Sequence, residues 1–227
     1  MLAKFLKSSI GRKQIVAVSG LLLMLFLVFH LSVNLGIYLG PHTYNLLAHR
    51  LEQLGPVRVV AEAGLTGLFL IHIFFTFLVV KASRRARKIG YAVQSSSAQR
   101  SLSTRLMPLT GTVLLVFIIS HLIDFKFIDV NNTLLAVVEE HNLGLYGIVV
   151  NSFRNPFTST WYMIAMIAVG SHLSHAIDSV FQTFGLNDGD THRGLHKSSV
   201  IIGTLIALLF GSIPLYVLLT HGSLLQQ

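Results

Sequence analysis

The sequence lacks cysteine and is poor in charge. None of its 227 residues is a cysteine, which excludes disulfides, thiolate zinc sites, iron–sulfur ligation by this chain and cysteine nucleophiles. Charged residues make up 11% of the chain, against about 25% in an ordinary soluble domain, and apolar residues make up 52%. The same figures exclude a disordered chain, because disordered chains are rich in charge and poor in apolar residues. The composition therefore predicts a membrane protein.

Five apolar stretches are long enough to cross a bilayer, which takes about 20 apolar residues for roughly 30 Å of hydrocarbon. The first stretch follows a basic N-terminus, but it is too long for the apolar region of a secretory signal and no A-x-A-like cleavage site follows it. We therefore expect it to be retained as a helix. The sequence predicts an all-α membrane protein, a single domain of five transmembrane helices at about 14–39, 57–80, 106–128, 157–184 and 199–220.

The distribution of the 17 Lys and Arg residues predicts the orientation. Only Arg50, Arg58, Lys126 and Arg154 fall on one side of the predicted membrane, and the other basic residues fall on the side of the N-terminus. Because positive loops mark the cytoplasmic side, the N-terminus is expected inside. The net charge of +8 is then explained by anionic lipid headgroups rather than nucleic acid. The basic, serine-rich stretch 81–105 also suits a docking face for a soluble partner.

Each of the first four predicted helices carries a histidine within its apolar run: His30, His72, His121 and His172. An ionisable side chain inside a membrane is costly and commonly functional. At about 1.5 Å per residue, His30 and His121 lie ~25 and ~24 Å from the inner boundary, and His72 only ~13 Å from it. His172 lies ~27 Å below the outer side. Depth therefore predicts an outer pair, His30 with His121, and an inner pair, His72 with His172.

Two facing imidazoles at each of two depths are typical of two b-type haems, each held by one axial ligand above and one below the ring. A zinc or di-metal centre favours clustered ligands that include carboxylates, and proton relays mix His with Asp or Glu. His175 follows His172 on nearly the same helix face and stays an alternative to it. Small residues would let a macrocycle approach or would simply ease helix packing; they are Gly20, Gly36, Gly64, Gly67, Gly111 and Gly170.

Over nearly its whole length the chain resembles the five-helix, dihaem cytochrome b subunit of succinate dehydrogenase and quinol:fumarate reductase. The resemblance rests on the opening SSIGRKQIVAVSGLLLMLFLVFHLSVNL, on one histidine in each of four spans, and on a fifth span without one. It also rests on HLSHAIDSVFQTFG, in which a histidine is followed by a serine two places on and a glycine after thirteen. This register implies that His172 is the ligand and His175 a neighbour.

The resemblance implies a subunit that is not an enzyme for succinate by itself. It would anchor a flavoprotein subunit and an iron–sulfur subunit to the inner membrane of a prokaryote. Electrons would move through the inner haem and then the outer haem toward a quinone, with menaquinone favoured. The family associates a glutamate after the first helix with quinol oxidation, and Glu52 occupies that place beside His49 and Arg50. A solvated loop acid is the alternative reading of Glu52.

Other polar residues have a weaker claim on the site. Asp178 and Asp124, near helix ends, are lesser candidates for the quinone site. Haem propionates have four conceivable partners: Arg12, Lys13, Arg58 and Ser32.

Three alternatives to this function stay open. The cytochrome b anchor of a hydrogenase or formate dehydrogenase typically has four spans, so the fifth span argues against it. A histidine-dependent, proton-coupled transporter predicts paired acids and an inverted repeat, and neither stands out in the sequence. A haem-free structural anchor would carry the four histidines only by accident.

Overall fold

The computed structural model describes residues 2–85, 102–129, 134–138, 140–186 and 192–221. Five long helices dominate it, and all five are long and apolar enough to cross a membrane. They are α2 (Ser9–Asn34), α4 (Pro56–Arg85), α5 (Leu102–Phe125), α7 (Pro156–Thr183) and α8 (His192–His221). The predicted all-α membrane fold with five spanning helices is therefore confirmed.

The helix boundaries differ from the predicted spans mainly at their polar ends. The first span is divided, because α2 ends at Asn34 and a 3-10 helix, η1 (Leu35–Leu39), completes it. Helix α4 continues to Arg85, several residues beyond its apolar run. A short helix, α1 (Leu2–Lys7), precedes α2 and meets it at a bend, where the Ser8 side chain accepts a hydrogen bond from the backbone N–H of Gly11.

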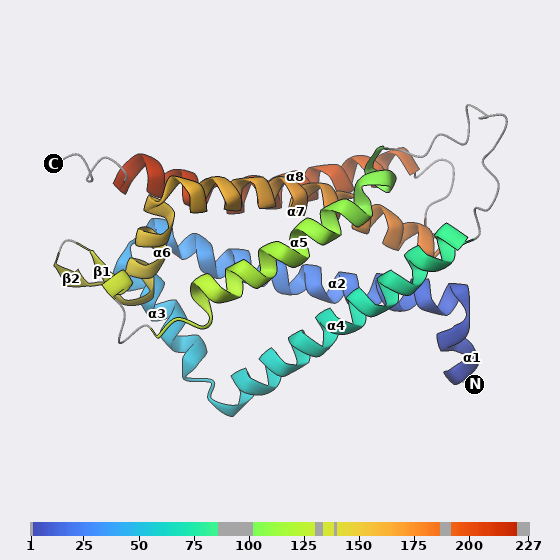
Figure 1. The fold of residues 1–227 in the computed structure, drawn as a ribbon, viewed down its shortest axis with the longest axis horizontal. Coiled ribbons are helices and arrows are strands. Elements are labelled where there is room, and N and C mark those ends of the chain that lie inside the picture. Colours follow the sequence, from blue (N-terminus) through green and yellow to red (C-terminus); the bar gives the residue numbers. More distant parts are fainter. Residues whose placement is uncertain (1, 86–101, 130–133, 139, 187–191, 222–227) are drawn as a thin grey trace.

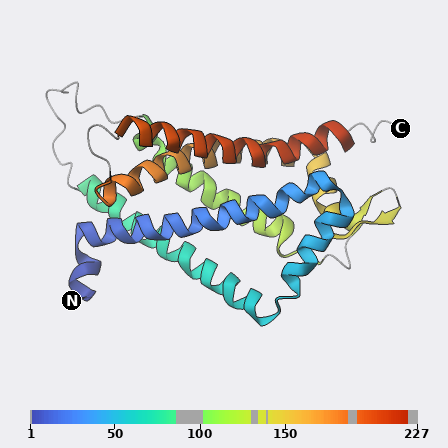
Figure 2. The ribbon, with the colours of Figure 1, turned by 180° about the vertical axis from the view of Figure 1, so that it is seen from behind.

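The helices form an elongated bundle with two different ends (Figure 1). We call the end that holds α1 and the N-terminus the N-side, and the opposite end the C-side. Helices α7 and α8 lie side by side, α5 and α2 pack against α7, and α4 packs against α2. Both views show α4 separating from α2 toward the C-side (Figure 2). No described residue of α4 is fully buried.

Helices α7 and α8 approach closely because glycines face each other between them. A Cβ atom added at Gly170 would lie 2.9 Å from Ala207 Cβ and 3.2 Å from the carbonyl oxygen of Gly203. A Cβ atom at Gly203 would lie 2.6 Å from the carbonyl oxygen of Gly170 and would also meet Ser174 Oγ. Such small-residue contacts are a usual way for membrane helices to pack.

The C-side is closed by elements that the sequence did not predict. These are α3 (Pro41–Glu52), η3 (Leu134–Ala136), the antiparallel strands β1 (Val137–Val138) and β2 (His141–Asn142), and α6 (Gly144–Arg154). Residues 129–155 carry no recognisable motif in the sequence, and α6 was not predicted because it is too short to span a membrane, yet most of it is buried in the structure. Its buried residues are Tyr146, Gly147, Ile148, Val149, Val150 and Phe153.

Asn45 ties α3 to α6. Its amide nitrogen donates to the carbonyl of Leu143 at 2.8 Å, and its amide oxygen accepts from the backbone N–H of Tyr146 at 3.1 Å. The rings of Tyr44 and Tyr146 are in edge contact beside this link. Burial raises the pKa of Tyr44 to about 12. We call the elements α3, η3, β1, β2 and α6 the C-side cap. Within it, the Asn45 hydrogen bonds join α3 to α6 across an otherwise apolar interface.

Candidate functional site

The structure places the four predicted histidines on the four helices that make up one side of the bundle. His30 lies on α2, His72 on α4, His121 on α5 and His172 on α7, and each is partly buried. Their rings point toward neighbouring helices, since each contacts a residue of another span. Helix α8 packs behind α7 and contributes a phenylalanine, Phe210, to the surroundings of His30.

His30 and His121 face each other across α2 and α5. Their ring centroids are 5.7 Å apart and their planes are nearly perpendicular, at 87°. Imidazole nitrogens bind transition metals at about 2 Å, so two rings that hold one ion from opposite sides have centroids roughly 6 Å apart. The observed spacing is close to this value. Aromatic rings surround the pair: Phe26, Phe117, Phe125, Tyr162 and Phe210.

Tyr162 connects His121 with a carboxylate. The Tyr162 hydroxyl donates to Asp124 Oδ2 at 2.7 Å and lies 3.5 Å from His121 Nδ1. Because a hydroxyl has one hydrogen, its oxygen is left to accept from Nδ1–H of His121. This arrangement leaves Nε2 of the ring with the free lone pair. Next to it, Trp161 Nε1 donates to Ser120 Oγ at 3.0 Å and fastens the same two helices.

His30 has a different neighbour, Asn34, one turn further along α2. The Asn34 amide donates to the carbonyl of His30 at 2.8 Å and makes a longer contact, 3.4 Å, with His30 Nε2. The Tyr44 hydroxyl donates in turn to the Asn34 amide oxygen at 3.2 Å. The C-side cap is thereby connected to the His30 level of the bundle.

His72 and His172 form the second pair, nearer the N-side, and are close enough to interact electrostatically. His72 Nδ1 lies 3.0 Å from Ser19 Oγ, and its ring also hydrogen-bonds the backbone of Val16. His172 Nδ1 lies 3.3 Å from Thr110 Oγ1. Helical depth predicts these same two pairs from the sequence. Their role as ligands of a cofactor stays a prediction.

His175, the alternative to His172, belongs to a separate polar group at the N-side end of α7. His175 interacts electrostatically with Asp178 and His196. Asp178 is only 8% exposed, and its Oδ2 pairs with His196 Nδ1 at 3.6 Å and lies 3.4 Å from Gln182 Nε2. Asp178 is therefore far from a C-side quinone site, whereas Asp124 lies beside His121 through Tyr162.

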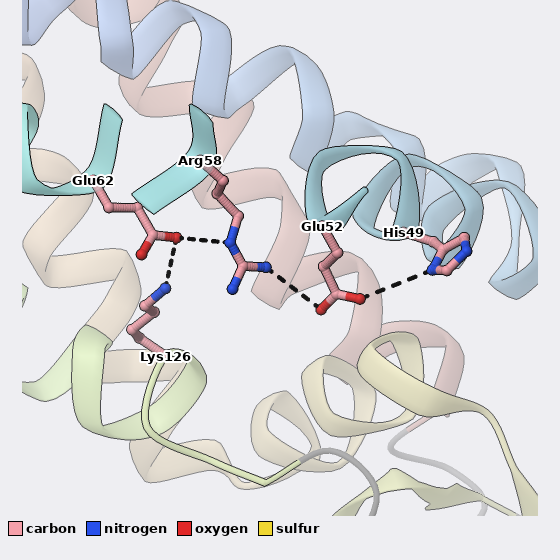
Figure 3. A network of polar contacts seen from close by, with 5 residues as sticks. All are labelled: His49, Glu52, Arg58, Glu62 and Lys126. Carbon is pink, nitrogen blue, oxygen red and sulfur yellow. Dashed lines mark hydrogen bonds and ion pairs between the residues drawn. The ribbon is translucent and has the colours of Figure 1, made fainter. Parts of the chain in front are cut away.

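Glu52 and His49 lie in an exposed chain of charges on the C-side (Figure 3). His49 Nδ1 is 3.9 Å from Glu52 Oε2, and Glu52 Oε1 is 3.9 Å from Arg58 NH1. Arg58 continues to Glu62, and Glu62 continues to Lys126 at 2.7 Å. The Glu52 side chain is 62% exposed. Arg50, the third residue predicted here, is exposed and takes part in none of these four ion pairs.

The four proposed propionate partners are placed unequally. Arg58 is occupied by carboxylates on both sides, and the Ser32 hydroxyl donates to the carbonyl of Phe29 in its own helix. Arg12 Nε donates to the carbonyl of Leu6 on the N-side. Lys13 is exposed beside it. None of these contacts involves a described histidine of the two pairs.

Sequence reasoning missed Arg154 as a candidate and counted it only as a charge. It closes α6 at the C-side and donates to Asn151 Oδ1 at 3.2 Å. Its Nε and NH2 atoms are buried and, among the residues that the structure describes, have no hydrogen-bond acceptor. Phe153 beside it contacts Phe125 and Tyr162, which both contact His121. A buried guanidinium with unmet donors fits an acidic group of a ligand.

The six glycines divide into different roles. Gly20 and Gly111 lie against histidine rings, whereas Gly170 packs against α8 and Gly36 against Leu47 and Tyr44. No described atom of another segment lies within 4 Å of a Cβ built at Gly64 or Gly67. Gly36 and Gly170 therefore pack against other protein segments, which favours the helix-packing interpretation for these two glycines.

The donor set fits haem b better than a clustered metal site. Within the described ranges no group of three or more His, Asp or Glu side chains is placed to hold a metal ion, whereas haem needs only two axial imidazoles. The hydroxyls beside His72, His121 and His172 each lie nearest to Nδ1 of the ring. Thr76 Oγ1, one turn beyond His72, is buried without a partner among the described residues.

No protein-family model, curated protein or solved structure matches this chain.

Proposed function

We propose that this chain is the membrane-anchor cytochrome b subunit of a succinate:quinone oxidoreductase. The observation that carries the proposal is the arrangement of four partly buried histidines, one on each of four spanning helices, as two pairs. Intramembrane histidines without a ligand or partner would be costly. Two bis-histidine sites give every one of these side chains a reason to be there.

One haem b would be held by His30 and His121, and the other by His72 and His172. Haem iron with two axial imidazoles supplies reversible one-electron transfer. The chain's own contribution is to fix the rings: Tyr162 orients His121, Ser19 orients His72 and Thr110 orients His172. Arg154, with its two buried donors, is suited to the propionates of the C-side haem.

The proposed complex sits in the inner membrane of a prokaryote with the N-side toward the cytoplasm. Lys4, Lys7, Lys13, Arg84 and Arg85 lie at or beside the N-side ends of α1, α2 and α4. This concentration of positive charge supports that orientation and offers a surface for the iron–sulfur and flavoprotein subunits. Most of the basic stretch 81–105, including Arg87, Lys88 and Arg100, lies outside the described residues.

The proposed quinone site lies on the C-side, and menaquinone is the favoured substrate. Quinone chemistry needs a proton donor or acceptor beside the ring oxygens. Glu52 with His49, and Asp124 with Tyr162, are two described carboxylates of the C-side that have such a neighbour. Glu52 is open to water, whereas Asp124 is linked to the His121 side chain, so Glu52 is suited to exchange protons with the aqueous phase.

A proton-coupled transporter is the second candidate, and one observation favours it. His121, Tyr162 and Asp124 form a histidine–hydroxyl–carboxylate series within the bundle, and proton relays mix these groups. The same experiment decides between the two functions, because a transporter needs no tetrapyrrole.

The test is the haem content of the purified complex, measured with its reduced-minus-oxidised spectrum. We expect two low-spin b haems per chain. His30→Ala and His121→Ala are expected to remove one centre, and His72→Ala and His172→Ala the other. His175→Ala is the matched control on α7 and is expected to leave both. A colourless, correctly assembled preparation, or retention of both centres in all four alanine variants, overturns the proposal.

A further inference from the structure

A short pattern occurs twice in the sequence, at the same distance from a histidine. Ser19 and Gly20 precede His30 by eleven and ten residues, and Thr110 and Gly111 precede His121 by the same intervals. Eleven residues are about three turns of an α-helix. In both α2 and α5, the hydroxyl residue and the histidine therefore lie on one face of the helix, roughly 16 Å apart along the axis.

In each case the hydroxyl and the glycine contact the histidine of another helix. Ser19 Oγ lies 3.0 Å from His72 Nδ1 on α4, and a Cβ at Gly20 would lie 3.2 Å from His72 Cε1. Thr110 Oγ1 lies 3.3 Å from His172 Nδ1 on α7, and a Cβ at Gly111 would lie 3.5 Å from His172 Cε1. The two contacts use the same two atoms of each ring.

Each hydroxyl donates its hydrogen within its own helix, so its oxygen is left to accept a hydrogen bond. Ser19 Oγ donates to the carbonyl of Ile15 at 2.7 Å, and Thr110 Oγ1 donates to the carbonyl of Met107 at 3.1 Å. Each hydroxyl has a single hydrogen, so its oxygen faces the histidine as an acceptor. This network assigns the ring hydrogen to Nδ1 of both histidines, which leaves Nε2 as the ligand atom.

The glycines give the rings room to reach those oxygens. Added at Gly20, a methyl group would press on the edge of His72 that adjoins Nδ1, and at Gly111 it would touch the equivalent edge of His172. The hydroxyl sets the ring's hydrogen, and the glycine leaves space for the ring to lie against the helix, a space that is tight at Gly20 and an ordinary van der Waals distance at Gly111.

We propose that Ser19–Gly20 and Thr110–Gly111 are one positioning device used twice, each fixing the tautomer and the plane of the N-side histidine on the neighbouring helix. This inference rests on the proposed function, because it assigns the two residues of each device to orienting haem ligands. Helices α2 and α5 thus act at both levels: each supplies a C-side histidine and, three turns earlier, orients an N-side one.

The device has a chemical consequence for the N-side haem. A hydrogen bond from Nδ1–H to an acceptor increases the basicity of the ring and fixes its orientation. A more basic axial ligand stabilises the oxidised iron and lowers the reduction potential, since hydrogen bonding to the ligands is one of the protein's means of tuning it. Loss of either hydroxyl is therefore expected to raise the potential of the N-side haem alone.

The experiment compares Ser19→Ala, Thr110→Val and Thr110→Ser in the assembled complex, by redox titration of each haem and by the low-spin electron paramagnetic resonance signals. Ser19→Ala and Thr110→Val should raise the N-side potential and move its largest g value, with the C-side haem unchanged. Thr110→Ser keeps the hydroxyl and should stay near the wild type. Thr112→Val is the matched control, because the Thr112 hydroxyl is exposed and donates only within α5, to the carbonyl of Pro108.

The outcomes separate this inference from the proposed function. Two haems with an N-side centre that is unmoved in both Ser19→Ala and Thr110→Val overturn the device and leave the function intact. Equal shifts in Thr110→Ser and Thr110→Val also overturn it, because volume rather than the hydroxyl would then be responsible. If Ser19→Ala does not assemble, the three Thr variants decide alone. Absence of haem from the wild type overturns both.

Discussion

Lys126 Nζ lies 2.7 Å from Glu62 Oε1 and joins the C-side end of α5 to α4. Both side chains are 43% exposed, and exposed ion pairs typically contribute about 0.2–1 kcal/mol. The pair is therefore a modest fastening. The pair matters because it links α4 to α5 at the end of the bundle where α4 separates from α2 (Figure 1).

A double-mutant cycle measures this fastening. Lys126→Met, Glu62→Gln and the double variant should show a coupling free energy of about 0.2–1 kcal/mol in detergent unfolding, falling as salt is raised. Glu62 also contacts Arg58, so the cycle is needed to isolate the pair. A coupling above roughly 2 kcal/mol would contradict a solvent-screened interaction.

Tyr162→Phe tests the link between His121 and Asp124. The variant removes the 2.7 Å hydrogen bond to Asp124 and the acceptor of His121 Nδ1–H, so it should cost about 1–3 kcal/mol of unfolding free energy. Under the proposed function it should also raise the potential of the haem held by His30 and His121, since the ligand ring loses basicity. Trp161→Phe breaks the neighbouring bond to Ser120 and serves as the control. It should lower stability and leave the C-side potential unchanged; equal potential shifts in both variants would speak against the link.

Gly20→Ala and Gly111→Ala should differ in severity. The Cβ added at position 20 would lie 3.2 Å from His72, which is a tight contact. The Cβ added at position 111 would lie 3.5 Å from His172, which is ordinary van der Waals contact. The first variant should therefore perturb the spectrum of the proposed N-side haem more than the second. Gly203→Ala is the packing control, because its Cβ would meet the backbone of Gly170. Overpacking of this kind costs about 1–3 kcal/mol, and it should lower the melting temperature with no specific change at either haem.

Alkaline pH should loosen the C-side cap. Burial raises the pKa of Tyr44 from its ordinary 10.0 to about 12, so between those values the unfolded chain loses a proton that the folded chain keeps. Stability is then full below pH 10 and falls as the pH rises toward 12, by on the order of 2 kcal/mol. Tyr44→Phe should flatten this slope in thermal melts at pH 9 to 12. Tyr146→Phe should remove a further part, because burial and Tyr216 raise the pKa of Tyr146 as well. An unchanged slope in the double variant would contradict the assignment.

The long helices could be predicted because a bilayer imposes a length on apolar runs. That constraint placed all five spans within a few residues, and helical rise alone grouped His30 with His121. Helices α3 and α6 could not be predicted in the same way, because they are too short to span and gain their stability from the tertiary packing of residues such as Tyr44 and Val150. The spanning helices can thus be predicted from the length of their apolar runs, whereas α3 and α6 form because of the residues they pack against.

The hydroxyl contacts of His72 and His172 could not be predicted from the sequence for a related reason. Ser19 and Thr110 are unremarkable hydroxyls within apolar helices, and only the packing of α2 on α4 and of α5 on α7 shows which rings they reach. The equal spacing to His30 and His121 was a signal that could have suggested it. Arg154 gave no such signal, since its unmet donors become visible only when α6 folds over the end of the bundle.

The second span has no fully buried residue. With no buried residue of its own, it is the span whose attachment would gain most from the proposed haem bound at His72. Under the proposed function, cells short of porphyrin are expected to accumulate chains in which α4 has separated from an otherwise assembled bundle. Membrane quality control would then recognise α4 first.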